Sequence, residues 1–415
     1  MMKVSIFARW MVGVLSAVML CIGLPNSAAA FDVGPLSIGG AMRANYYFGD
    51  YTDPAPGSPS RPSRAEEDKG TIALDIFRIN LDYAQGPWVG KLEYRFYPGY
   101  AANNSDGYHF LHTGWVGYNF EDKSQVQVGV NRVPFGPGPY GVSQSWFFDQ
   151  HYYVGLSDDM DLGVKYTKPM GPLTVDMAYY FSDEGNYYGS TEDSTRYSYD
   201  VVDETGTGYE ERNQVNLRAI YALDALDGTD VGLSLQYGQL KSNGPQDDGN
   251  DFAVSVHAVP KLGNWTLGLQ LTYYTYNVDA AQPVGTDKLV QFGAYDFPTL
   301  VAAEAWIPAV SLSYKIETPQ VDWLDYVLPY VEYSALVKSE SSFNDSGLFV
   351  AGAAWASGGW YIYSEAAFSN GNDFVGNEAG YGAPSTLPYF TSNRLGENSS
   401  NDWEYRFNIN FGYYF

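Results

Sequence analysis

Cysteine is almost missing from this sequence: its 415 residues include a single one, Cys21. That residue lies in an N-terminal segment that we expect to be removed, so the rest of the chain has no thiol. Disulfide bonds, thiolate metal sites and a cysteine nucleophile are therefore excluded for residues 31–415. The fold must be held together by backbone hydrogen bonds and packing.

Basic residues are scarce as well. The chain has 23 Lys and Arg against 48 Asp and Glu, a formal net charge of −25 at pH 7. A protein that binds nucleic acid normally presents a basic surface to the phosphates. We therefore expect no nucleic-acid partner.

Long apolar runs are absent after residue 30, which excludes membrane-spanning helices there. The one apolar run, residues 10–24, follows Lys3 and Arg9 and precedes a small-residue stretch that ends at Ala30. This order is typical of a secretory signal peptide. We expect residues 1–30 to be cleaved after Sec-dependent export, leaving a single domain over 31–415 with 21 basic and 48 acidic residues, a net charge of −27.

Aromatic residues, by contrast, are abundant, at 17% of the chain with 37 tyrosines. Tyr and Trp suit a membrane surface because an apolar ring ends in a polar tip. The last residues of the chain place aromatic or apolar side chains at every second position: Trp403, Tyr405, Phe407, Ile409, Phe411, Tyr413 and Phe415. This period of two over a length that crosses a bilayer at a tilt predicts a transmembrane β-strand.

The same alternation recurs upstream, with charges on the opposite face and no helical pattern to cover the apolar one. The apolar face is then expected to meet lipid and the charged face a water-filled lumen. Candidate strands start near Leu36, Thr71, Trp88, Phe110, Ser124, Asp161, Leu173, Gln214, Val231, Phe252, Trp265, Ile307, Val327, Gly347, Trp360 and Trp403. We predict an all-β, antiparallel transmembrane barrel of about 16 strands, 14 and 18 remaining open, with short periplasmic turns and long extracellular loops. A soluble two-domain sandwich would need a linker, and none is visible.

One segment, residues 134–161, breaks the pattern. Residues 132–141 contain three prolines and three glycines, so the chain must leave the wall here. The residues that follow are rich in rings: Trp146, Phe147, Phe148, His151, Tyr152 and Tyr153. Such side chains need cover, which the lumen would supply.

Two motifs resemble known proteins. The C-terminal run resembles the last strand of outer-membrane proteins of Gram-negative bacteria, in which the terminal Phe, here Phe415, is part of the signal read by the barrel-assembly machinery. Residues 129–136, GVNRVPFG, resemble the strand-end motif of the porin superfamily that includes the phosphate-selective porins O and P. The resemblance implies a 16-stranded homotrimer in outer-membrane lipid and lipopolysaccharide, with the loop after the fifth strand constricting the pore.

The charges in this segment depart from phosphate selectivity. Residues 134–161 hold no Lys or Arg but do hold Asp149, Asp158 and Asp159. We expect these acids to face a basic wall made by Arg43, Arg78, Lys91, Arg95, Arg132, Arg218 and Arg406. The two sets would create a transverse field, as in general porins. Alternatively, the wall charges pair across neighbouring strands, as Arg78 with Glu93.

The predicted function is passive diffusion of small hydrophilic solutes or ions through an outer-membrane porin, with no enzymatic activity and no cofactor or metal. The first alternative is a channel selective for a sugar or an anion, in which the rings of Trp146, Phe148 and Tyr152 line the path of the solute. Otherwise these rings only pack the loop against the wall. The second alternative is an outer-membrane enzyme. Ser145, His151 and Asp149 could be combined into a catalytic triad, although no nucleophile motif frames the serine. The acidic long loops serve solubility, or bind divalent cations or lipopolysaccharide without a recognisable ligand spacing.

Overall fold

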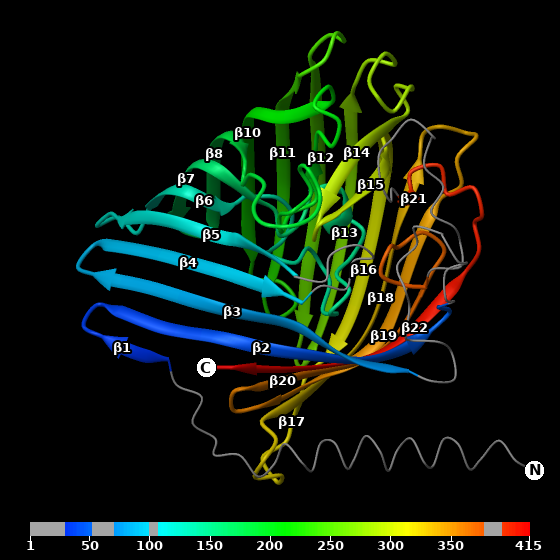
Figure 1. Cartoon of the computed structure of the whole chain (residues 1–415). Helices are drawn as coiled ribbons and strands as arrows, with labels where there is room; N and C mark the ends of the chain where they lie inside the picture. The colour runs from blue at the N-terminus through cyan, green and yellow to red at the C-terminus, as the bar shows by residue number, and fades with distance from the viewer. Residues whose placement is uncertain (1–29, 52–69, 99–106, 377–391) are drawn as a thin grey trace, which may run out of the picture.

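The computed structural model describes residues 30–51, 70–98, 107–376 and 392–415 (Figure 1). The predicted signal peptide lies outside them, apart from Ala30. Among the described residues, none of the helical structure is long and apolar enough to span a bilayer.

The main sheet contains 18 strands, of which β1 (Phe31–Val33) and β17 (Ile316–Glu317) are short extensions and the other 16 form the wall. The first nine wall strands are β2 (Leu36–Gly49), β3 (Thr71–Gln85), β4 (Trp88–Tyr97), β5 (Tyr108–Asn119), β6 (Gln125–Arg132), β7 (Met160–Met170), β8 (Leu173–Asp183), β10 (Tyr209–Leu223) and β11 (Thr229–Ser242). The rest are β12 (Gly249–Leu262), β13 (Trp265–Asn277), β16 (Glu304–Tyr314), β18 (Tyr326–Lys338), β19 (Ser346–Ser357), β20 (Trp360–Ser369) and β22 (Glu404–Tyr414).

The wall is a closed barrel. Each strand pairs antiparallel with the next along the chain, and β2 pairs with β22 to close the ring, with Asn45 opposite Asn410. The predicted strands are confirmed in number and order. The largest displacement of a start is at β10, which was expected from Gln214 and begins at Tyr209.

Side-chain burial shows which way each face points. On β13, Leu269 and Leu271 are about two-fifths exposed, whereas Gln270 and Thr272 between them are buried. On β22, Phe407 points outward and Arg406 and Asn408 inward. Apolar residues outside and polar residues inside invert the pattern of a soluble protein, so the barrel is built to lie in a lipid bilayer.

The two ends of the barrel differ, as the sequence predicted. At one end the strands are joined by tight turns with glycines in the left-handed region, as at Gly86 (φ 59°) and Gly263 (φ 56°). Long connections occupy the other end. Figure 1 shows the tight β3–β4 turn and the long connection that carries β14 and β15 at opposite ends of the wall.

The long loops are more ordered than a polar composition suggests. Three of them contribute a second, four-stranded sheet, in the order β21 (Ser392–Leu395), β15 (Phe297–Ala302), β14 (Leu289–Ala294) and β9 (Asp200–Val201). Every residue of these four strands is buried. Their apolar side chains join a core with inward-facing residues of the wall, for example Phe292 against Tyr276 at 5.1 Å between ring centroids. At the long-loop end, the barrel interior is therefore packed rather than lined only by water.

Candidate functional site

The candidate site is built around the inward loop, residues 133–159, which leaves β6, the fifth strand of the wall, and returns at β7. Three hydrogen bonds follow its outgoing course: Gly136 N donates to Ser234 Oγ (3.0 Å), Ser143 Oγ to Glu332 (2.7 Å), and Trp146 N to Glu365 (2.8 Å). These acceptors lie on the inner face of β11, β18 and β20. The loop thus runs inside the barrel, where the sequence placed it.

The returning half of the loop follows the same side of the wall. Gln150 N donates to Ser334 Oγ at 3.0 Å, and the His151 ring lies 2.8 Å from Thr272 Oγ1. Residues 152–154 form a short 3-10 helix, η1 (Tyr152–Val154), whose last carbonyl accepts a hydrogen bond from Tyr276. Most of these partners lie on strands between β11 and β20. The opposite edge of the loop therefore faces the inner side of β2 to β8.

A glycine on β13 allows this close approach. A Cβ added at Gly268 would lie 2.6 Å from Ser311 Oγ and 2.8 Å from Val142 Cβ. Ser311 also donates to the Val142 carbonyl at 2.6 Å, so the contact is a fixed one. The loop rests on the wall at this point because the wall has no side chain there.

Replacing Gly268 by Leu should therefore push the inward loop off the wall toward the open side of the lumen. We expect a lower single-channel conductance, by about twofold, with the barrel retained, since overpacking one position typically costs about 1 to 3 kcal/mol. Planar-bilayer recording measures this. Leu269→Met, one residue away on the lipid face, is the control; equal conductance of G268L and wild type would show that the loop does not limit flow.

The loop acids are not where the sequence analysis put them. Asp149, Asp158 and Asp159 are only 3 to 4% exposed. Asp149 accepts hydrogen bonds from the backbone of Val142 and His151 and contacts the His151 ring at 3.0 Å, which fixes the turn of the loop. A carboxylate accepts such local backbone donors readily, and the sequence gives no warning of it. The loop was expected to present a negative edge to water. Instead, Asp149 forms hydrogen bonds within the loop.

Asp158 is paired as well. It binds Arg132 at 2.7 Å and accepts a hydrogen bond from Tyr197 on the next long loop. His151 is fully buried between Asp149 and Thr272, while Ser145 contacts Ser143 instead of the imidazole. The triad drawn from the sequence is thus not assembled.

The rings of the loop divide into buried and accessible ones. Tyr152 is buried and stacks on Phe148 at 4.3 Å between centroids. Trp146 and Phe148 are half-buried, and Tyr140, which the sequence analysis did not select, is 49% exposed. The edge of the loop that reaches water is aromatic rather than acidic.

Facing this edge, four arginines of the wall form ion pairs in which the two partners are unevenly exposed. The pairs are Arg43–Asp75 (2.9 Å), Arg78–Glu93 (3.1 Å), Arg132–Asp158 (2.7 Å) and Arg218–Asp176 (2.8 Å). Their arginine side chains are 20 to 37% exposed, whereas the acids are 2 to 10% exposed. The interpretation of paired wall charges therefore describes these four arginines, and in each pair the arginine is the more exposed partner.

The other predicted wall residues lie elsewhere. Arg95 and Arg406 are buried against rings, Arg95 over Tyr197 at 4.3 Å and Arg406 over Trp146 at 4.8 Å. Lys91 pairs with Asp82 at 3.4 Å beside a hollow of about 490 Å³ at the tight-turn end. Arg95, Arg406 and Lys91 thus stabilise the wall and the loop. The arginines beside the accessible edge of the loop are the four of the ion pairs above.

Sequence reasoning missed the rings supplied by the other long loops. Tyr295, at the turn between β14 and β15, contacts Tyr97, Tyr152 and Tyr197 and sits at φ 53°. Its neighbour Asp296 ties this turn to another long loop. Burial alone would raise the pKa of Asp296, but hydrogen bonds from Ser190, Thr191 and Thr195 hold it below its usual value. No sequence pattern links these distant segments.

Comparison with known proteins supports the fold. No protein-family model and no curated sequence matches the chain. Among solved structures, the outer membrane channel DcaP of Acinetobacter baumannii is 11% identical with a TM-score of 0.57, over 93% of this chain and 100% of that one. The anion-selective porin from Comamonas acidovorans is 11% identical with a TM-score of 0.51, over 92% and 100%. OmpT of Vibrio cholerae in its trimer form is 15% identical with a TM-score of 0.52, over 92% and 100%. At these identities the likeness is one of fold, and it confirms the porin-type β-barrel predicted from the sequence.

Proposed function

We propose that this protein is a porin of a Gram-negative outer membrane through which small hydrophilic solutes, anions in preference to cations, diffuse down their gradient. One observation carries the preference: the side chains of four wall arginines are 20 to 37% exposed, whereas those of the acids that pair with them are only 2 to 10% exposed. The apolar outer face of the barrel supports the location.

Electrostatics explains why this arrangement favours anions. An ion that enters a narrow, low-dielectric lumen loses part of its hydration, and fixed guanidinium donors replace that loss for an anion but not for a cation. Because each arginine keeps a nearby acid, the field is partly cancelled. We therefore propose a preference of several-fold rather than strict exclusion of cations.

The proposal stops short of phosphate. The inward loop has no Lys or Arg between residues 134 and 161, and its water-facing edge is aromatic. An anion would therefore meet positive charge on one side of the lumen only. No catalytic step, cofactor or metal is needed for this function.

For assembly, we propose cleavage after Ala30, a single barrel domain over residues 31–415, recognition of Phe415 by the barrel-assembly machinery, and a homotrimer in lipid and lipopolysaccharide. The trimer form of OmpT, a protein of the same fold, supports the oligomeric state.

Liposome swelling tests the function. Proteoliposomes of the purified mature protein should swell in isotonic solutions of a small sugar, and faster in those of a sugar acid of equal size; liposomes without protein give the baseline. Absence of swelling with both solutes would overturn the proposal, and faster swelling with the neutral sugar would remove the anion preference.

A further inference from the structure

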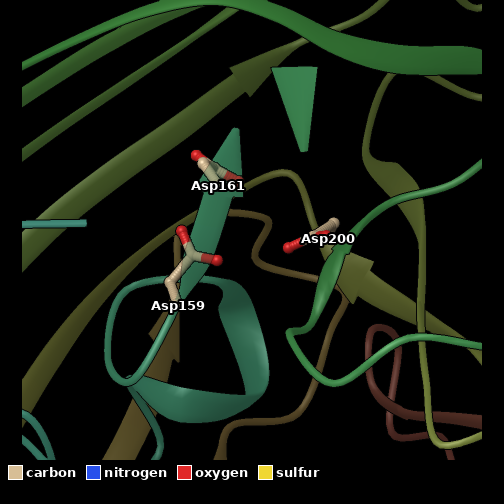
Figure 2. Close-up of side chains that lie close together, drawn as sticks. All are labelled: Asp159, Asp161 and Asp200. Atoms are coloured by element: carbon tan, nitrogen blue, oxygen red, sulfur yellow. The ribbon is translucent and has the colours of Figure 1, made fainter. Parts of the chain in front are cut away.

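A second set of charged residues lies where the inward loop enters β7, next to the Arg132–Asp158 pair. Asp159 ends the loop, Asp161 lies on β7, and Asp200 opens β9 on a different long loop (Figure 2). Carboxylate oxygens of the three lie within 4.8 Å of one another, and the residues are 1 to 4% exposed. Figure 2 shows Asp200 approaching the other two from a facing segment of chain.

A fourth carboxylate points to a ligand. Glu184 is 5% exposed and belongs to the loop that carries Asp200. Its Oε1 accepts from Ser198 N at 2.8 Å, but its Oε2 is shielded from water and has no hydrogen-bond partner among the described residues. The Glu184 side chain reaches that of Asp200. Two ionised carboxylates in contact offer each other no hydrogen-bond donor, so either a proton or a cation has to lie between them.

The three aspartates show the same shortage. Asp159, Asp161 and Asp200 each have a buried Oδ1 without a partner among the described residues. Each residue also has a partner: Asp161 Oδ2 accepts from Gln214 at 3.0 Å, Asp200 Oδ2 binds Arg196 at 3.1 Å, and Asp159 is hydrogen-bonded to Ser198.

Among the described residues, the one cation that forms an ion pair with these four acids is Arg196, and it does not compensate for their charge. Arg196 is itself shared among Asp200, Asp183 (2.9 Å) and Asp193 (2.5 Å). Burying unpaired carboxylates is strongly unfavourable, and coordination of a metal ion removes that cost.

We propose that Asp159, Asp161, Asp200 and Glu184 bind one divalent cation of the calcium class. All four ligands are carboxylates without His or Cys, which excludes the preferred ligands of zinc and copper. Calcium takes six to eight oxygens in irregular arrangements, whereas magnesium demands a regular octahedron and gives up water reluctantly. The ion would join the end of the inward loop to the loop that carries β9, a structural role that the proposed diffusion of anions does not require.

The test uses the mature protein in detergent, stripped with EDTA, dialysed into metal-free buffer at pH 7, and titrated calorimetrically with CaCl₂ alone and with MgCl₂ alone. We expect one saturable calcium ion per chain, tighter than magnesium, and a rise in the unfolding temperature on binding. The double variant D159N/D200N should lose at least tenfold in calcium affinity. D247N, an exposed aspartate on another loop, should bind as wild type does.

E184Q is a second variant, for use if the double variant does not fold. It leaves the inward loop and β7 unaltered and should also weaken calcium binding. No calcium binding by the wild type, or equal binding by D159N/D200N, E184Q and wild type, would overturn the site. Liposome swelling by the same preparations reads the channel separately, so failure of the metal site leaves the proposed function testable.

Discussion

Replacing Arg78 and Arg218 together by glutamine should lower the anion-to-cation permeability ratio several-fold. A unit charge near the ion path is worth about 1 kcal/mol at 4 Å in water, and 1.4 kcal/mol corresponds to a factor of ten. The acid beside each arginine cancels part of this energy, which leaves a several-fold effect. These two arginines suit the test because their acids keep other partners: Glu93 retains Arg95 at 2.5 Å, and Asp176 retains Thr167 Oγ1 at 2.6 Å. The buried acids are therefore not left alone.

The measurement is the zero-current potential of the reconstituted channel in a KCl gradient. R78K/R218K keeps the charge while changing its geometry and should retain the anion sign, which separates charge from packing. A zero-current potential that stays the same in R78Q/R218Q and wild type would show that the wall arginines do not set selectivity.

Removing the β14–β15 hairpin should raise the single-channel conductance several-fold. Both strands are buried, and with Tyr295 they pack on the rings of the inward loop and of β13, occupying space inside the barrel that water and ions would otherwise fill. The flanking residues are already adjacent, since Ala303 N donates to Lys288 O at 2.9 Å. Residues 289–302 can thus be replaced by two glycines, and β13 and β16 pair directly without them.

Single-channel recording of the deletion variant beside wild type gives the result. Y295S, which removes only the ring at the tip of the hairpin, should give a smaller increase. A deletion variant that folds, as shown by heat-dependent mobility in detergent gels, but conducts like wild type would show that the hairpin lies outside the ion path.

The wall could be predicted from the sequence because each strand of a membrane barrel alternates apolar and polar residues with a period of two. Leu269 and Leu271 alternate with Gln270 and Thr272 whatever the rest of the chain does, and lipid outside and water inside demand that order. The inward course of the loop followed from prolines and glycines that no strand accommodates. Both inferences need only neighbouring residues.

The sequence identified the residues that make up the inward loop, but not the groups to which they are hydrogen-bonded. Asp149 and Asp158 are acidic as expected, yet their donors, Val142 N and Tyr197, are set by the folded loops and cannot be read from composition. The second sheet was likewise unpredictable, because its strands come from three loops interpreted as polar connections. The cluster of Asp159, Asp161 and Asp200 has no ligand spacing in sequence, since its third member reaches it from another loop.

Single-channel recording of the purified wild-type protein in a planar bilayer, with a KCl gradient across it, tests the central claim most directly. We predict stable ohmic steps and a zero-current potential whose sign shows that chloride passes more readily than potassium. Insertion without conductance would contradict the channel, and a potential of the opposite sign would contradict the role of the exposed arginines.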